Sequence, residues 1–213
     1  MARGFLSKGF SLKDYSAKIN FNGIDLNIFK PRENNLREKY NIPENKFIIL
    51  GCSFAWGFRK GQDVFIKLAQ DLDEKKFQIV MVGTDNKNLP GNIIQIPITF
   101  SQYELAEIYS GSDVLANPTR EENYPTVNLE SLACGTPVVS FNSGGTPETF
   151  DETCGISIER DDYENFKNAL IRVCEQKIFN REDCAKYARE HHDGNKKLME
   201  YVNLYDEMLN TKR

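Results

Sequence analysis

Short, unbroken apolar runs recur through the middle of the chain and limit its fold more narrowly than any other feature. The first reads FIILGC at 47–52 and the second FQIVMVG at 77–83. Runs this short, without polar alternation, are typical of parallel strands that are buried on both faces of a sheet. Four further runs follow, at residues 92–98, 113–117, 137–141 and 154–158.

Segments with helical periodicity separate these runs. Apolar residues recur at helical spacing after the first run, and Ser101 with Glu104 forms a capping box that opens another helix. Beyond Asp161 the chain turns helical, with one helix expected to begin at Asn180 and a last one to carry Leu198 and Val202. The alternation predicts a doubly wound α/β domain, with a parallel sheet, helices on both faces and a helical C-terminal tail.

The bulk composition excludes several classes of function. A formal net charge of −4 argues against broad contact with nucleic acid, so any anionic ligand is expected to be small. The five cysteines contain no C-x-x-C pair, which favours a reduced compartment over a disulfide framework or a zinc site. No apolar run is long enough for a secretory or membrane-spanning segment. We therefore expect a cytoplasmic protein that would contact a membrane only through a partner or another domain.

Ligands of doubly wound sheets bind beyond the carboxyl ends of the strands, and three segments fall there: 53–61, 118–126 and 142–148. The first ends in Arg59-Lys60-Gly61, directly before a helix. Two cations beside the positive end of a helix dipole suit a diphosphate. Taken alone, the tripeptide favours a simpler interpretation, a pair of solvated surface cations.

The other two segments supply carboxylates and glycines. Glu130 lies off the helix face that would pack on the sheet, so both it and Glu122 could accept hydrogen bonds from sugar hydroxyls. The alternative interpretation is a carboxylate that the helix dipole favours at a helix start, and Glu121 fits that interpretation as well as Glu122 does. Gly144 and Gly145 would allow close backbone approach to a ligand, or would simply form a tight surface turn.

The order of these features resembles a known family. Glu122, seven intervening residues and Glu130, then LACGTPVVS (132–140) and GG-x-PE (144–148), resemble the signature of family 4 (group 1) retaining glycosyltransferases of the GT-B architecture. NGID (22–25) resembles the stretch with which that family enters its C-terminal, donor-binding domain. The resemblance covers roughly residues 15–210. It implies a linker over 1–30 and a Rossmann-like domain over 31–213 that binds a nucleotide sugar and forms half of a GT-B fold.

The resemblance also implies roles for matching residues. Glu130 would hold the ribose hydroxyls, Glu122 would contact the donor sugar near the reacting centre, and Arg59 with Lys60 would neutralise the diphosphate. The donor would be of UDP or GDP type, and no metal or other cofactor is implied. The remaining contacts, from backbone N–H groups and from the segment around the base, are expected at Tyr124, Thr126, Val127, Gly144, Gly145 and Ile98.

Two departures from the family pattern put some of these assigned residue roles in doubt. Asn123-Tyr124-Pro125 stands where many members have Gly-Phe-Gly, and Pro125 cannot donate a backbone hydrogen bond, which puts phosphate contacts near Thr126 in doubt. Cys52 follows Gly51 where the family usually has Arg. We assume that Arg59 supplies that charge instead.

The chain has sequence for only one of the two GT-B domains. We therefore expect the other partners to be an N-terminal acceptor-binding domain and a glycan or lipid-linked acceptor, with no nucleic acid. The chain alone should bind a nucleotide sugar with little or no transfer. Two alternatives stay open: a non-catalytic nucleotide-binding or scaffold module that has kept the fold, and another GT-B enzyme such as an epimerase or phosphorylase.

Other conspicuous residues are expected to have structural roles. His191 and His192 are interpreted as a solvated helix end, and Cys134 as a small core residue. The Asp161-Asp162 pair is interpreted as a helix N-cap. Trp56 could either cover a ligand or fix its loop to the domain.

Overall fold

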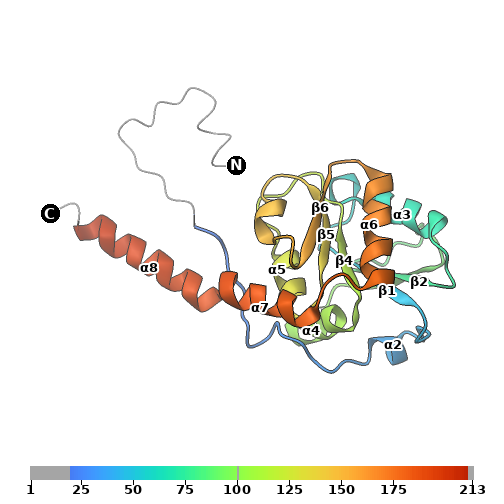
Figure 1. Ribbon diagram of the computed structural model, residues 1–213, viewed down its shortest axis with the longest axis horizontal. Coiled ribbons are helices and arrows are strands. Elements are labelled where there is room, and N and C mark those ends of the chain that lie inside the picture. The colour runs from blue at the N-terminus through green and yellow to red at the C-terminus, as the bar shows by residue number, and fades with distance from the viewer. Residues whose placement is uncertain (1–19, 100, 211–213) are drawn as a thin grey trace.

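A computed structural model describes residues 20–99 and 101–210 and contains one six-stranded, fully parallel sheet (Figure 1). All six predicted strands are present, each within two residues of its expected bounds. In chain order they are β1 (Phe47–Cys52), β2 (Phe77–Val82), β3 (Ile93–Ile96), β4 (Val114–Asn117), β5 (Val138–Asn142) and β6 (Gly155–Glu159).

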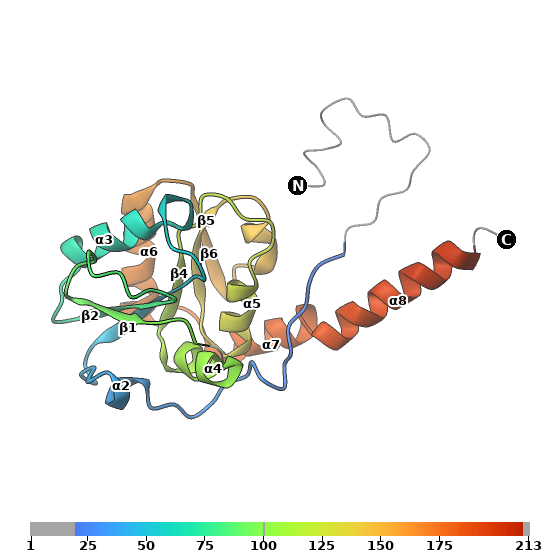
Figure 2. The same cartoon turned by 180° about the vertical axis from the view of Figure 1, so that it is seen from behind.

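Helices cover both faces of the sheet, as predicted (Figures 1 and 2). One face packs against α3 (Gln62–Asp71) and α6 (Tyr163–Gln176), and the other against α4 (Gln102–Gly111), α5 (Thr126–Ala133) and α7 (Arg181–His191). Successive residues of β1 serve opposite faces, which is why these strands are apolar throughout: Ile48 and Leu50 enter one core cluster, and Ile49 the other.

The strand order is β3-β2-β1-β4-β5-β6. The chain moves outward from β1 through β2 to β3, then returns to the other side of β1 to begin β4. The loops after β1 and β4 therefore diverge over opposite faces of the sheet and leave a crevice between them. This is the strand order of a doubly wound, Rossmann-like sheet, the fold class that the sequence predicts.

The helix starts follow the predicted caps. Ser101 accepts a hydrogen bond from the Glu104 N–H, Asp162 from Asn165, and Asn180 from Glu182. Each cap satisfies a free N–H in the first turn of its helix. Between them they set where α4, α6 and α7 begin, and hence where the loops at the sheet edge end.

The segment that leads into the sheet packs along one side of the domain. It includes α2 (Leu36–Lys39), a short helix that the sequence pattern does not predict, and it buries Phe29 and Leu36. Ile24 bridges to Asp193, so the start of this segment is joined to the junction between α7 and the last helix. Residues 1–19 of the expected linker lie outside the described residues, and the division near residue 30 stays a prediction.

The last helix, α8 (Gly194–Asn210), projects away from the domain (Figures 1 and 2). None of its residues is buried, and its large apolar side chains are exposed, Leu198 by 61% and Leu209 by 68%. Within the described part of the chain, no helix is both long and apolar enough to span a bilayer.

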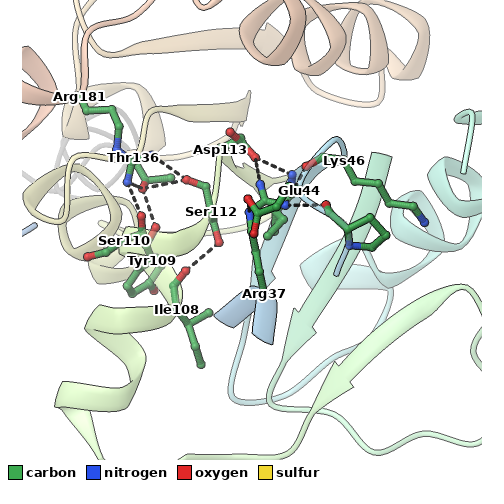
Figure 3. Close-up of polar contacts among 12 residues, drawn as sticks. Arg37, Glu44, Lys46, Ile108, Tyr109, Ser110, Ser112, Asp113, Thr136 and Arg181 are labelled. Carbon is green, nitrogen blue, oxygen red and sulfur yellow. Dashed lines mark hydrogen bonds and ion pairs between the residues drawn. The ribbon is translucent and has the colours of Figure 1, made fainter. Parts of the chain in front are cut away.

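Two polar clusters join elements at the end of the sheet opposite the crevice (Figure 3). In one, Arg181 of α7 donates to the backbone oxygens of Ser110 and Ser112, at 2.6 and 2.8 Å, and to the Thr136 hydroxyl at 3.0 Å. These bonds tie the start of α7 to the end of α4 and to the turn before β5. Because carbonyls at a helix end otherwise lack partners, one guanidinium here satisfies several acceptors at once.

In the other cluster, Asp113 Oδ2 accepts from the backbone N–H of Ile48 at 2.7 Å and contacts Arg37 at 3.4 Å. Ile48 is fully buried. Asp113→Ala leaves that N–H without its acceptor, so we expect the free energy of unfolding to fall by about 1–3 kcal/mol. Urea denaturation measures the loss. Asp113→Asn keeps an acceptor oxygen and is the matched control; an equal loss in both variants would contradict this explanation.

Candidate functional site

Two adjoining cavities lie at the crevice between the loops after β1 and β4. The first is about 380 Å³ and the second about 190 Å³, and they share the wall formed by Cys52, Ser53, Phe54 and Val127. Most of the residues singled out from the sequence line one or the other. The first cavity receives Arg59, Lys60, Glu122, Tyr124, Thr126 and Val127, and the second Ile98, Val127 and Glu130.

The first cavity holds an ion pair between Lys60 and Glu122, which are 62 residues apart in sequence. Both side chains are largely buried, with 23% and 20% of their surface exposed. Glu122 also accepts from the N–H of Asn123 at 3.1 Å. Arg59, which the same short helical turn carries (η1, Phe58–Lys60), is exposed at this cavity. A cation from one loop and a carboxylate from the next are thus held at one place, as the sequence analysis expects.

Arg120 holds these two loops together, and the sequence analysis does not anticipate it. Its guanidinium donates to both carboxylate oxygens of Asp63 at 2.8 Å and to Asp161 at 2.6 Å. It also stacks on the ring of Phe58 at 3.8 Å, and its backbone N–H bonds to the Arg59 carbonyl at 2.9 Å. The loop after β4 is therefore clamped to the loop that carries the cations.

The second cavity combines apolar walls with one carboxylate. Ile98, Val82 and Leu105 line it, and Glu130 lies at its wall. Tyr109 is fully buried and donates its hydroxyl to Glu130 Oε2 at 3.0 Å. Burial raises the pKa of Glu130, whereas the hydrogen bonds from Tyr109 and Thr126 lower it. The arrangement suits a ligand with a flat apolar part and neighbouring hydroxyls.

Helix α5 points its N-terminus at the first cavity, since Thr126 begins the helix and lines that cavity. Pro125 is the N-cap residue rather than a member of the first turn. The N–H groups that a helix start leaves free belong to the residues after the cap, here Thr126 and Val127. Pro125 therefore does not remove the donors that the sequence analysis puts in doubt.

Gly144 and Gly145 line neither cavity. A Cβ atom built on Gly144 would lie 1.8 Å from the Glu122 carbonyl oxygen, and one on Gly145 would lie 1.9 Å from that of Asn123. Gly144 also has a φ of +57°, in the left-handed region. The close approach that the glycines allow is thus to the backbone of the loop carrying Glu122. Direct contact between these glycines and a ligand stays a prediction.

Cys52, the last residue of β1, and Trp56, in the loop that follows, have roles that the sequence left open. Cys52 lines both cavities, and burial raises the pKa of its thiol to about 12, so the thiol stays protonated and adds no negative charge beside Arg59 and Lys60, the cationic side chains of the first cavity. Trp56 lines the first cavity but also donates its ring N–H to the Val82 carbonyl at 2.9 Å and packs edge-on against Phe65. It therefore fixes the loop and forms part of the cavity wall.

The interpretation of both tail histidines as solvated is wrong for His192. Its ring is 1% exposed, and Nε2 lies 2.8 Å from the Thr149 carbonyl. Burial lowers its pKa, so the ring is neutral at pH 7. Its other nitrogen faces the hydroxyl of Tyr124, a residue that lines the first cavity, at 3.5 Å. His192 lies in the two-residue link between α7 and α8, where its backbone carbonyl accepts from the Ile24 N–H, and its ring is buried while His191 stays exposed. The charged local sequence gives no sign of this packing.

The matching family and two similar curated proteins are all glycosyltransferases. Residues 32–191 match the family described as glycosyl transferases group 1. A D-inositol 3-phosphate glycosyltransferase of Streptosporangium roseum is 27% identical over 173 residues, which are 70% of this chain and 40% of that protein. A GDP-mannose-dependent monoacylated alpha-(1-6)-phosphatidylinositol monomannoside mannosyltransferase of Corynebacterium glutamicum is 26% identical, covering 73% of this chain and 46% of the relative.

Solved structures agree on the fold. Sucrose-phosphate synthase from Thermosynechococcus elongatus superposes with a TM-score of 0.83 at 21% identity, over 99% of this chain and 57% of that one. Anabaena HepE in complex with UDP-glucose gives 0.81 at 17% identity, over 96% and 61%. The chain thus spans less than two thirds of these proteins and has the fold of one half of a GT-B structure. By its sequence match over residues 32–191, the chain belongs to the group 1 glycosyl transferases.

Proposed function

We propose that this chain is the donor-binding half of a retaining glycosyltransferase of family 4, which transfers a sugar from a nucleoside-diphosphate sugar to a glycan or lipid-linked acceptor. One observation carries the proposal: two cavities share a wall, one with cations and a helix N-terminus, the other apolar with a carboxylate. Such a pair matches the two halves of a nucleoside diphosphate. HepE has been solved with UDP and with UDP-glucose, which supports a donor of this class.

Each part of the donor has a matching part of the site. The base would enter the apolar second cavity beside Ile98, and Glu130 would accept from the ribose hydroxyls. The diphosphate would lie in the first cavity, against Arg59, Lys60 and the free N–H groups of Thr126 and Val127. These groups need no metal to offset the charge of the departing diphosphate. Glu122 would then face the donor sugar from the same cavity.

The Lys60–Glu122 ion pair favours transfer over a scaffold role. A module that only packed against a partner would not need a cation and a carboxylate held together inside a cavity, because burying both costs desolvation free energy. In the proposed function the pair keeps Lys60 in place until a diphosphate competes for it. Glu122 is then released toward the sugar.

Nucleotide binding tests the proposal directly. Trp56 is the only tryptophan in the chain and lines the first cavity, so its fluorescence should report occupancy. Titration with UDP, GDP and their sugars should give a saturable change, which EDTA leaves intact, with affinities confirmed by calorimetry. If none of these nucleotides bound, the scaffold alternative would replace this proposal. Rapid sugar transfer by the 213-residue chain alone would contradict its assignment as a donor-binding half.

Lys60→Ala tests the diphosphate contact. We expect the affinity for UDP to fall about tenfold, equivalent to ~1.4 kcal/mol, because the variant loses a charge-assisted contact to phosphate. Calorimetry at fixed ionic strength measures the change. Lys75→Ala removes the same charge from an exposed turn at the other end of the strands and is the matched control. Equal affinities for the two variants would exclude Lys60 from the site.

A further inference from the structure

Phe54 lies where the two cavities meet, and it belongs to neither of the two hydrophobic core clusters. It lines both cavities and is 81% exposed, more than any other large apolar side chain in the described residues. A ligand that occupies both cavities must pass this residue. The position therefore distinguishes Phe54 from an ordinary exposed apolar residue, which would need no explanation.

The loop that carries Phe54 is anchored on both sides of it. Ser53 is buried and its backbone N–H bonds to the Val82 carbonyl at 3.3 Å, while Trp56 donates its ring N–H to the same carbonyl at 2.9 Å. The Ser53 hydroxyl also accepts from the Ala55 N–H at 3.3 Å. The exposed ring is thus presented by a fixed backbone, so little conformational entropy is lost when a ligand covers it.

A second exposed aromatic residue of the same loop shows the contrast. Phe58 is 70% exposed, but the Arg120 guanidinium stacks on its ring at 3.8 Å. In 20–99 and 101–210, no ring or cation stacks on Phe54 in this way. An uncovered aromatic face beside an apolar cavity suits a planar group, since an aromatic ring can stack on any of the nucleobases.

We propose that Phe54 is a specificity-determining residue whose ring stacks on the base of the bound nucleotide. This inference rests on the proposed function and goes beyond it, because it assigns recognition of the nucleoside to a residue of the loop that otherwise serves the phosphates. Two residues of one loop would then recognise different parts of the ligand. Phe54 selects for a nucleoside, and Lys60, six residues later, selects for a diphosphate.

The test compares ligands with and without a base. Phe54→Ala should weaken binding of UDP and of UMP by about five- to tenfold, in line with loss of a stacked base, and leave binding of inorganic pyrophosphate unchanged. Lys60→Ala should weaken pyrophosphate and UDP more than UMP. Phe54→Tyr keeps the aromatic face and should restore affinity, whereas Phe54→Leu keeps only apolar volume and should restore it in part. Calorimetry gives each affinity, and thermal melting confirms that the variants stay folded.

The results distinguish a failure of this inference from a failure of the proposed function. If wild-type protein bound UDP and Phe54→Ala bound it equally well, the inference alone would fall. An equal loss of UMP and pyrophosphate binding would show that Phe54 only shapes the loop, which also overturns it. Failure of the wild-type protein to bind any nucleotide would overturn both proposals.

Discussion

Replacing Glu130 by alanine should weaken UDP binding by about ten- to a hundredfold, equivalent to ~1.4–2.8 kcal/mol, the largest loss expected from any single side chain of the site. Glu130 lines the second cavity, and one of its oxygens already accepts from Tyr109. Thr126 also hydrogen-bonds this carboxylate, but its two oxygens have about four acceptor positions between them, which leaves room for the ribose hydroxyls. Hydrogen bonds to a charged, largely desolvated acceptor are the strong ones, so their loss is not replaced by water.

Calorimetric titration with UDP measures this effect, and Glu121→Ala is the matched control. Glu121 belongs to the same loop as Glu122 but is exposed and lines neither cavity. Its replacement removes one negative charge from the same region and should leave affinity within twofold. An unchanged affinity in Glu130→Ala would refute the ribose role, whatever Glu121→Ala does.

The Glu130 carboxylate should lower the folding stability at neutral pH while it strengthens UDP binding. Burial raises the pKa of Glu130 above its value in the unfolded chain, so the protonated form is the one that the fold favours. Ionisation at neutral pH therefore costs folding free energy, and stability from this group is lost as pH rises through the raised pKa. Glu130→Gln should accordingly melt at a higher temperature than wild type at pH 7 while binding UDP more weakly. UDP affinity itself should fall as pH drops through that pKa.

Gly144→Ala should lower the free energy of unfolding by about 2–4 kcal/mol and disturb the site as well. The new methyl group would lie 1.8 Å from the Glu122 carbonyl oxygen, and the φ of +57° is itself unfavourable for alanine. Relief of the clash must push away the loop that carries Glu122. We therefore expect weaker UDP binding together with the lost stability.

Urea denaturation and UDP titration of the same variant check both parts. Gly91→Ala is the matched control, because a methyl group there would meet nothing within 4 Å. Control and variant make the same change in unfolded-chain entropy, so their difference isolates the native-state clash. A Gly144→Ala protein as stable as Gly91→Ala would mean that the turn can move freely away from the loop.

Much of the fold followed from local sequence. Apolar runs such as 47–52 must be buried on both faces, which predicted six strands, and the helical periodicity between the runs predicted helices on both sides. The caps at Ser101, Asp162 and Asn180 fixed helix starts because they act within three residues of themselves. Helix α2 escaped prediction, since four residues provide too short a stretch for a periodic pattern.

The candidate site was predicted only as three separate loops. Position at strand ends and a resemblance to a known signature placed Arg59, Lys60, Glu122 and Glu130 in it. Their actual partners could not be derived in the same way. The bond from Tyr109 to Glu130 spans 21 residues, and the contact between the buried His192 ring and the Thr149 carbonyl spans 43. No local pattern encodes either contact.

By itself, the sequence determined which segments become strands and helices, where the helices begin, and which loops carry charge, because periodicity and capping act over a few neighbouring residues. Only the tertiary structure decided that β4 pairs with β1. That pairing brings Lys60 onto Glu122, lets Arg120 clamp the two loops, and leaves Phe54 uncovered between two cavities. Contacts across such distances in sequence depend on how whole faces pack together, which no short stretch of residues specifies.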